Sequence, residues 1–241
     1  MLTAKKRFPI GQIILFGFWP SPIKRLLYRL RGYEIGKNVS ISFGAVVCGE
    51  KVRIGSGTSI SFFSFVRGRE IDIGERVAIG AATMIDTPYV EIGDDTRINE
   101  QVFIGGLQFP DSRIRVGKNC QIMQMTFINP AKGITIGDDT GIGGDSLVFG
   151  HTSWLSQFEG YPVQFEPIEI GNSVSIAWRV RGFRLNQCYK PEASLPAETP
   201  RAIRMDAQFR PGISNLAFNC KSTPFHTIPR LLQITYQHVD L

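Results

Sequence analysis

Histidine is the side chain best suited to accept a proton near neutral pH, because its ordinary pKa is about 6.5. The chain has 3 histidines. His151, in the segment FGHTSW at 149–154, lies within repetitive sequence, whereas His226 and His238 lie near the end. A catalytic zinc site needs three protein ligands, so the repeats cannot build the three-histidine kind, and we expect no metal. His151 alone is a candidate general base, with a purely structural histidine as the alternative.

The cysteines and the apolar segments indicate where the protein works. The 4 cysteines, Cys48, Cys120, Cys188 and Cys220, form no C-x-x-C pair, so we expect buried thiols in a reducing compartment. No apolar stretch reaches the roughly 18–20 residues of a membrane-spanning helix. The apolar run at 10–19 follows basic residues but ends in WPSP without a small-residue cleavage site. We therefore expect a cytoplasmic protein.

The net charge is unevenly distributed along the 241 residues. The chain has 27 Lys+Arg and 21 Asp+Glu, a net charge of +6. Residues 1–33 carry seven basic and no acidic side chains, residues 34–178 carry eleven and seventeen, and residues 179–241 carry nine and four. The long central part is therefore acidic, which excludes a general nucleic-acid-binding surface.

An aliphatic residue followed by glycine recurs along the central part. The first three intervals are nineteen residues each, and the next are twenty-four, twenty and thirty-four. Steps of six occur inside them, so the unit is a hexad and about three hexads make one longer repeat. The pairs are Ile35-Gly36, Ile54-Gly55, Ile73-Gly74, Ile92-Gly93, Val116-Gly117, Ile136-Gly137 and Ile170-Gly171.

This periodicity predicts an all-β solenoid. Each hexad gives a short strand with its aliphatic residue pointing inward, and aliphatic residues one coil apart stack in ladders. The glycine lies at the corner, where the backbone needs either a positive φ or a close approach. A sandwich of short strands is the alternative, but hairpins do not produce constant intervals of nineteen.

Two long intervals contain insertions. The first adds residues 106–111 (GLQFPD), and the second adds an aromatic and polar loop at 151–167. Insertions in solenoids form surface loops and often the binding face. Trp154, Phe158 and Tyr161 in the longer loop suit either stacking on a sugar ring or packing of the loop itself.

A short amphipathic helix is predicted before the repeats, at 22–31. Ile23, Leu26, Leu27 and Leu30 form one apolar stripe, and basic residues occupy the other faces. Ser21 is the expected N-cap, with Pro22 in the first turn and Gly32 at the C-terminal end. We expect this helix to cover the first coil, with contact with an anionic membrane as the alternative.

The hexads, the preceding helix and the late histidine loop resemble the hexapeptide-repeat acyltransferases, and most closely the O-acetyltransferases of bacterial polysaccharide and capsule synthesis. The resemblance covers about residues 21–180. It implies a left-handed parallel β-helix, a homotrimer, acetyl-CoA as acyl donor and a sugar or glycan acceptor. The left-handed winding comes from this resemblance and not from the spacing.

The resemblance also implies roles for individual residues. His151 corresponds to the catalytic base, in a groove that a neighbouring subunit closes. Asn129, about one coil earlier, would either contact the acceptor or point inward as a capping residue. Trp154 would hold the acceptor. Ala177 and Trp178 would line the thioester end of the donor site, and Arg179 would meet phosphate.

Two carboxylates lie near the histidine in the sequence and could orient its ring. Asp145 precedes His151 by one hexad, which places it on an adjacent face and favours a corner residue over an orienting partner. Glu159 in the long loop could orient the imidazole, or could be a solvated loop charge. Neither is assigned to the site.

The chain divides into an N-terminal segment and helix at 1–33, a β-helix at 34–180 with its loop at 151–167, and a non-repetitive tail at 181–241. The resemblance implies further coils and a Gly-Asn-Pro-Ala-Arg motif where the tail stands. EASLPAETPRA at 192–202 can be back-translated so that a shifted frame reads SVIAGGNPAR, which suggests a reading-frame change. A divergent or disordered tail is the alternative. In that case the protein would be an impaired enzyme, or a non-catalytic or decayed β-helix with an incomplete CoA site.

Overall fold

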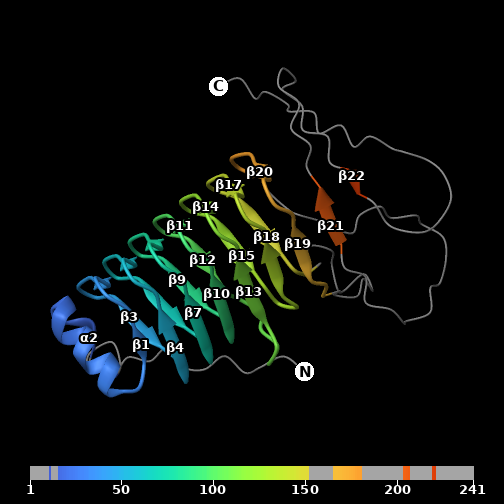
Figure 1. Cartoon of the computed structure of the whole chain (residues 1–241). Coiled ribbons are helices and arrows are strands. Elements are labelled where there is room, and N and C mark those ends of the chain that lie inside the picture. Colours follow the sequence, from blue (N-terminus) through green and yellow to red (C-terminus); the bar gives the residue numbers. More distant parts are fainter. Residues whose placement is uncertain (1–10, 12–15, 152–164, 181–202, 207–218, 221–241) are drawn as a thin grey trace, which may run out of the picture.

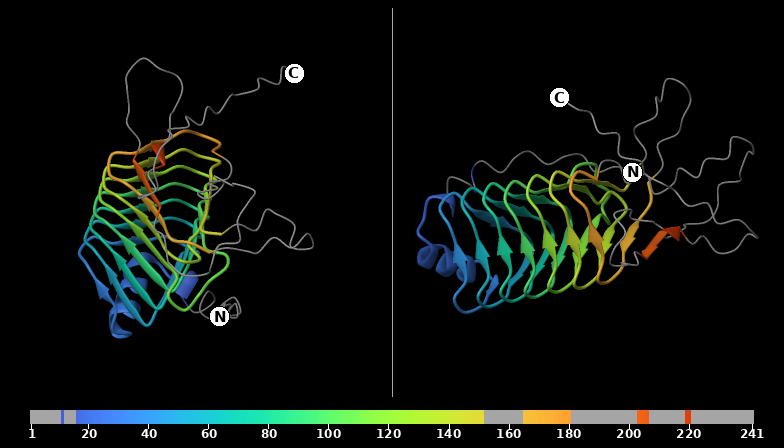
Figure 2. Two further views of the ribbon diagram at one scale, coloured as in Figure 1. Left: turned by 90° about the vertical axis from the view of Figure 1, so that its right-hand side faces the viewer. Right: turned by 90° about the horizontal axis from the view of Figure 1, so that it is seen from above.

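The computed structural model describes residues 11, 16–151, 165–180, 203–206 and 219–220. Its strands wind into a left-handed parallel β-helix, whose coils stack along one axis (Figures 1 and 2). The helix α2 (Ser21–Leu30) lies across the N-terminal end of the stack. Each coil contributes one strand to each of three sheets, which we call sheets A, B and C in the order in which the chain meets them. The predicted solenoid is therefore confirmed.

Sheet A carries the longest strands and extends beyond the regular coils. Its strands are parallel except for the last pair, β21 and β22, which is antiparallel. They are β1 (Glu34–Ile35), β4 (Lys51–Ile54), β7 (Glu70–Ile73), β10 (Tyr89–Ile92), β13 (Arg113–Val116), β16 (Ile134–Ile136), β19 (Ile168–Ile170), β21 (Ile203–Asp206) and β22 (Asn219–Cys220).

Sheets B and C are wholly parallel. Sheet B consists of β2 (Ser40–Ile41), β5 (Ser59–Ile60), β8 (Ala78–Ile79), β11 (Arg97–Ile98), β14 (Gln121–Ile122), β17 (Gly141–Ile142) and β20 (Ser175–Ile176). Sheet C consists of β3 (Val46–Cys48), β6 (Phe65–Arg67), β9 (Met84–Asp86), β12 (Phe103–Ile104), β15 (Phe127–Asn129) and β18 (Leu147–Phe149).

The core is a set of aliphatic ladders, as the hexads predict. In sheet A the residue before each repeat glycine pairs with its equivalent in the next coil, from Ile35 with Ile54 through to Ile136 with Ile170. In sheet B the residue six positions later does the same, from Ile41 with Ile60 to Ile142 with Ile176. These side chains are almost fully buried. No single coil could bury them, so neighbouring coils stabilise one another.

The repeat glycines are required by close approach and not by a positive φ. A Cβ on Gly93 would lie 2.6 Å from the backbone carbon of Gly117 in the next coil. The positive φ falls two residues later in the same corner, on residues such as Asn38, Arg76 and Asp95. The second of the two explanations offered by the sequence is therefore the correct one.

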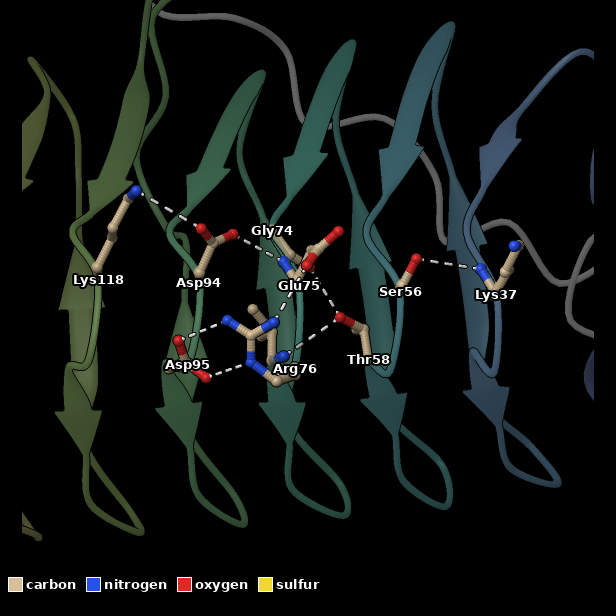
Figure 3. A network of polar contacts seen from close by, with 10 residues as sticks. Lys37, Ser56, Thr58, Gly74, Glu75, Arg76, Asp94, Asp95 and Lys118 are labelled. Atoms are coloured by element: carbon tan, nitrogen blue, oxygen red, sulfur yellow. Dashed lines mark hydrogen bonds and ion pairs between the residues drawn. The ribbon is translucent and has the colours of Figure 1, made fainter.

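Polar contacts between coils join the corner of sheets A and B (Figure 3). Arg76 donates to both carboxylate oxygens of Asp95, at 2.6 and 2.8 Å. Asp94 accepts from the Glu75 amide at 2.8 Å and pairs with Lys118. Part of the acidic charge of the repeats is thus paired across coils.

Buried hydroxyls satisfy the backbone where the chain turns inside the corners. Thr58 donates to the Gly74 carbonyl at 2.8 Å and accepts from the Val77 amide at 3.2 Å, and Thr96 bridges Gly117 and Cys120 in the same way. The predicted buried thiols are confirmed for Cys48 and Cys120. Among the described residues, no helix is long and apolar enough to cross a membrane.

The helix α2 covers the first coil, as predicted, but two details of the prediction are wrong. Pro20 and not Ser21 is the N-cap, and the Ser21 hydroxyl instead accepts a hydrogen bond from the Ile41 amide at 3.0 Å. The face turned to the coil carries Lys24 and Tyr28, whereas Ile23, Leu26 and Leu30 of the apolar stripe are exposed.

Candidate functional site

Both sequence insertions emerge at the same edge of the β-helix, where sheet C turns into sheet A. The shorter one joins β12 to β13, and the longer one joins β18 to β19. Phe109 from the first packs edge-to-face against Phe165 at the end of the second, with ring centroids 5.0 Å apart. We call this edge the C–A corner. It is the part of the molecule where loops that the regular coil does not require come together.

His151 lies at the C–A corner, directly after β18, and its side chain is directed at Asn129 on β15. The Asn129 side-chain nitrogen lies 2.9 Å from His151 Nε2. Only 9% of His151 and 3% of Asn129 is exposed. Two residues that the sequence selected separately, twenty-two positions apart, therefore form one buried polar pair.

A glycine makes room for this pair. Gly106, in the shorter insertion, has a φ of +118°, and a Cβ there would lie 2.8 Å from the Asn129 side-chain nitrogen. A larger residue at 106 would displace the amide that contacts the imidazole. The sequence shows only that Gly106 lies in a surface insertion. The spacing of the repeats does not reveal that this glycine lies against the Asn129 side chain.

The pair leaves two buried polar atoms without a hydrogen-bond partner, Asn129 Oδ1 and His151 Nδ1. If the amide nitrogen donates to Nε2, the ring proton must lie on Nδ1 and the ring has no free lone pair. If the amide is turned so that Oδ1 accepts from Nε2–H, the free lone pair lies on Nδ1. The second arrangement satisfies Oδ1 and leaves a buried basic nitrogen available to a ligand.

The surroundings of the imidazole are largely aromatic. Phe149 and Phe165 lie on either side, with ring centroids 5.4 and 5.8 Å from that of His151. Burial lowers the pKa of His151 below its ordinary value, because an apolar environment disfavours the charged form. The imidazole is therefore neutral at physiological pH, which a general base requires.

A semi-buried ion pair lies on sheet C beside the C–A corner. Arg67 donates to both carboxylate oxygens of Asp86, at 2.8 and 2.5 Å. Gln108, in the shorter insertion, donates from its side chain to the Asp86 carbonyl oxygen. The sequence analysis missed these residues, although Arg67 and Asp86 stand one nineteen-residue coil apart.

The residues expected to bind the acyl donor lie at a different corner. Ala177, Trp178 and Arg179 follow β20, where sheet B turns into sheet C. The Trp178 side chain covers Gly144 and is half exposed. Arg179 pairs with Asp145 at 3.5 Å. Asp145 is thus a corner residue, as predicted, with a φ of +53°.

Within one chain, the structure does not bring these residues to His151. The strand β18 and its flanks separate Asp145 from His151 by six positions, which corresponds to roughly 20 Å of extended chain. Trp154, Phe158, Glu159 and Tyr161 lie outside the described residues. Within the described part of the chain, no group of three His, Cys, Asp or Glu side chains could hold a metal ion.

Comparisons with known proteins return structures but no sequence relatives. No family model matches the chain, and no curated protein matches it. AntD, an N-acyltransferase from Bacillus cereus solved with dTDP and coenzyme A, is 21% identical with a TM-score of 0.45, over 55% of this chain and 80% of that chain.

Two further solved structures are similar to the chain. A second AntD structure, with dTDP-4-amino-4,6-dideoxyglucose and coenzyme A, gives 19% identity and a TM-score of 0.45, over 52% of this chain and 78% of that one. UDP-N-acetylglucosamine acyltransferase from Campylobacter jejuni gives 16% identity and a TM-score of 0.39, over 62% of this chain and 65% of its own.

Proposed function

We propose that this protein is an acyl-CoA-dependent O-acyltransferase, with acetyl-CoA as donor and a hydroxyl of a sugar or glycan intermediate as acceptor. The resemblance of the hexads to acyltransferases supports the class. The observation that carries the proposal is the buried, unpaired Nδ1 of His151, held against Asn129 at the corner where both insertions emerge.

In this proposal His151 accepts the proton of the acceptor hydroxyl as the oxygen attacks. Asn129 accepts a hydrogen bond from Nε2–H, which fixes the tautomer and leaves the Nδ1 lone pair for the hydroxyl. The aromatic rings of Phe149 and Phe165 exclude water from the neutral imidazole. When bound, acetyl-CoA would supply the thioester carbonyl that the oxygen attacks. The carbon–sulfur bond would then break, and the proton held by His151 would pass to the departing CoA sulfur, which leaves His151 neutral again. In this proposal Asn129 is a positioning residue, in place of the acceptor contact and the inward-capping role between which the sequence left the choice open.

Ala177, Trp178 and Arg179 remain our proposal for donor binding. Arg179 presents an exposed guanidinium, although Asp145 already pairs with it. The half-exposed Trp178 ring offers an apolar surface to an extended chain. We also propose that Trp154 contacts the acceptor, that the protein works as a cytoplasmic homotrimer, and that a neighbouring subunit closes the site.

The test is release of free CoA from acetyl-CoA in the presence of a panel of sugar and sugar-nucleotide acceptors. His151→Asn keeps the size and polarity of the side chain but removes the base, and we expect turnover to fall by about 10²–10⁴-fold. Arg97→Gln, an exposed position on sheet B, is the matched control and should retain full turnover. Unchanged turnover in His151→Asn would refute the role of His151.

A second candidate function is a non-catalytic β-helix with an incomplete donor site. The observation that favours it is the end of the hexads at residue 180, where the resemblance implies further coils. Calorimetric titration with CoA separates the two candidates. Binding that Arg179→Ala weakens supports the enzyme, and no binding by the intact chain supports the scaffold.

A further inference from the structure

One side of α2 exposes large apolar side chains. Ile23, Leu26 and Leu30 lie on one side of the helix, with 39%, 59% and 76% of their surfaces exposed. The helix lies at the N-terminal end of the stack of coils (Figure 1), and the buried Lys24 and Tyr28 occupy the side turned to the first coil. We call these three residues the outer stripe.

The outer stripe is not needed to hold the helix in place, because other side chains do so. The fully buried Lys24 donates from Nζ to the carbonyls of Ser42 and Ala45, at 2.6 and 2.9 Å. The buried Tyr28 hydroxyl accepts from the Val47 amide at 3.0 Å. These contacts pair the open backbone edge of the first coil, a task that leucine or isoleucine cannot perform.

All charged side chains of the helix and of the segment before it are basic. Residues 1–33 contain seven basic side chains and no acidic one. Arg25 precedes Leu26 in the sequence and is half-buried, and it forms no ion pair with a described residue. Arg31 follows the helix, and its guanidinium lies over the rings of Phe16 and Tyr33, 5.7 and 5.6 Å from their centroids. In the repeats, by contrast, several basic side chains pair with carboxylates of a neighbouring coil. An apolar stripe in a segment with positive charge and no acidic side chain favours a surface that is both apolar and anionic.

Exposed aromatic rings continue the apolar surface at the start of the helix. Trp19 and Phe18 directly precede it, with 46% and 59% of their surfaces exposed. Phe18 packs edge-to-face on Phe43 of the first coil, at a centroid distance of 5.3 Å. Aromatic side chains of this kind prefer the boundary between lipid and water.

We propose that the outer stripe docks this protein on an anionic lipid bilayer, with α2 lying in the headgroup region and the axis of the β-helix extending away from it. Ile23, Leu26 and Leu30 would enter the acyl-chain boundary, Trp19 would lie at the interface, and Arg25 would contact anionic headgroups. This proposal does not depend on the acyltransferase function, because none of these residues belongs to the C–A corner.

Sedimentation of the full chain with vesicles tests the proposal. We expect binding to phosphatidylglycerol–phosphatidylcholine vesicles, and much weaker binding to vesicles of phosphatidylcholine alone. Replacing both Leu26→Ser and Leu30→Ser should weaken binding by about tenfold or more, since several buried CH₂ groups are lost. Arg25→Gln should weaken it by about fivefold, and added salt should weaken it further.

Matched control variants distinguish binding through the outer stripe from nonspecific hydrophobic or electrostatic binding. Met125→Ser removes an equally exposed apolar side chain elsewhere (59%), and Arg97→Gln removes an exposed positive charge from sheet B. Both should bind vesicles like the unchanged protein. Sedimentation velocity without lipid should give the same oligomeric state for the Leu26→Ser, Leu30→Ser variant and the unchanged chain.

Three results would overturn the proposal. The first is no binding of the unchanged protein to anionic vesicles, and the second is equal binding by the stripe variant. The third is loss of an oligomer in the stripe variant, which would show that a second copy of this chain covers the outer stripe. Turnover at the C–A corner would remain intact in each case, so failure here differs from failure of the proposed function.

Discussion

In the proposed mechanism, the side-chain amide of Asn129 determines which nitrogen of the His151 imidazole keeps a free lone pair. An imidazole with both nitrogens engaged cannot act as a base, whereas one whose Nε2–H is held by an amide oxygen keeps Nδ1 free. The 2.9 Å contact and the unpaired Nδ1 make Asn129 the residue that selects between these states. In the proposed function, the chemistry of the site would therefore depend on a pair and not on a lone histidine.

Replacing Asn129→Asp should shift the pH dependence of the reaction. In the unchanged protein burial lowers the pKa of His151 below 6.5, so the acidic limb of kcat/KM should lie below that value. A carboxylate beside Nε2 stabilises the imidazolium, so the variant's limb should move to higher pH by about one pH unit or more. The measurement is a kcat/KM profile across the acidic range.

Folding must be monitored at each pH, because acid also destabilises the native state. The unfolded imidazole binds its proton at a higher pH than the folded one, so stability falls as the pH drops below 6.5. Circular dichroism at each pH provides the control. A limb that stays in place while the variant remains folded would show that Asn129 only fills space.

At the level of elements, the repeat glycines allow neighbouring coils to approach. Gly93→Ala would place a Cβ 2.6 Å from the backbone carbon of Gly117, and we expect it to destabilise the fold by about 1–3 kcal/mol. Gly141→Ala is the matched control, since nothing lies within 4 Å of its added Cβ. It should change stability by less than about 0.5 kcal/mol. Urea unfolding midpoints compare the two, and equal midpoints would contradict the close-approach explanation.

Among the elements, the sequence predicts the aliphatic ladders but not the orientation of α2. The ladders of Ile35, Ile54 and their equivalents follow from periodicity alone, because an inward residue recurs once in each coil. The orientation of α2 could not be predicted from the sequence, because an amphipathic pattern predicts that the apolar stripe faces the core. The open edge of the first coil presents unpaired backbone groups, and their pairing with Lys24 and Tyr28 reverses the default.

Lys24→Met tests this explanation of the helix orientation. It removes the donor from two backbone carbonyls, so we expect a loss of about 1–3 kcal/mol in the free energy of unfolding. Burial lowers the pKa of Lys24 to about 8 from the ordinary value of 10.5. The unfolded chain therefore binds more protons between these values, and the stability contributed by Lys24 rises with pH there. Unfolding curves across this range should show the rise in the unchanged protein and lose it in the variant.

At the scale of the whole molecule, the candidate groups occupy two corners joined by sheet C. His151, Asn129 and both insertions gather at one, and Trp178 and Arg179 lie at the other. The sequence nominates these residues as candidates, but it does not show that they lie at two different corners of one chain. The order of the hexads does not reveal which faces of neighbouring subunits meet. A donor that contacts both groups must either span a face of roughly 20 Å or bind between two subunits.

Mixed assemblies distinguish these two arrangements. A chain carrying His151→Asn still offers Trp178, and a chain carrying Trp178→Ala still offers His151. If the site lies between subunits of a cyclic homotrimer, random mixing after unfolding and refolding together should restore about a quarter of the wild-type sites. Each variant refolded alone provides the baseline. If both residues serve the same site within one chain, no mixed assembly contains an intact site, and turnover should remain at that baseline.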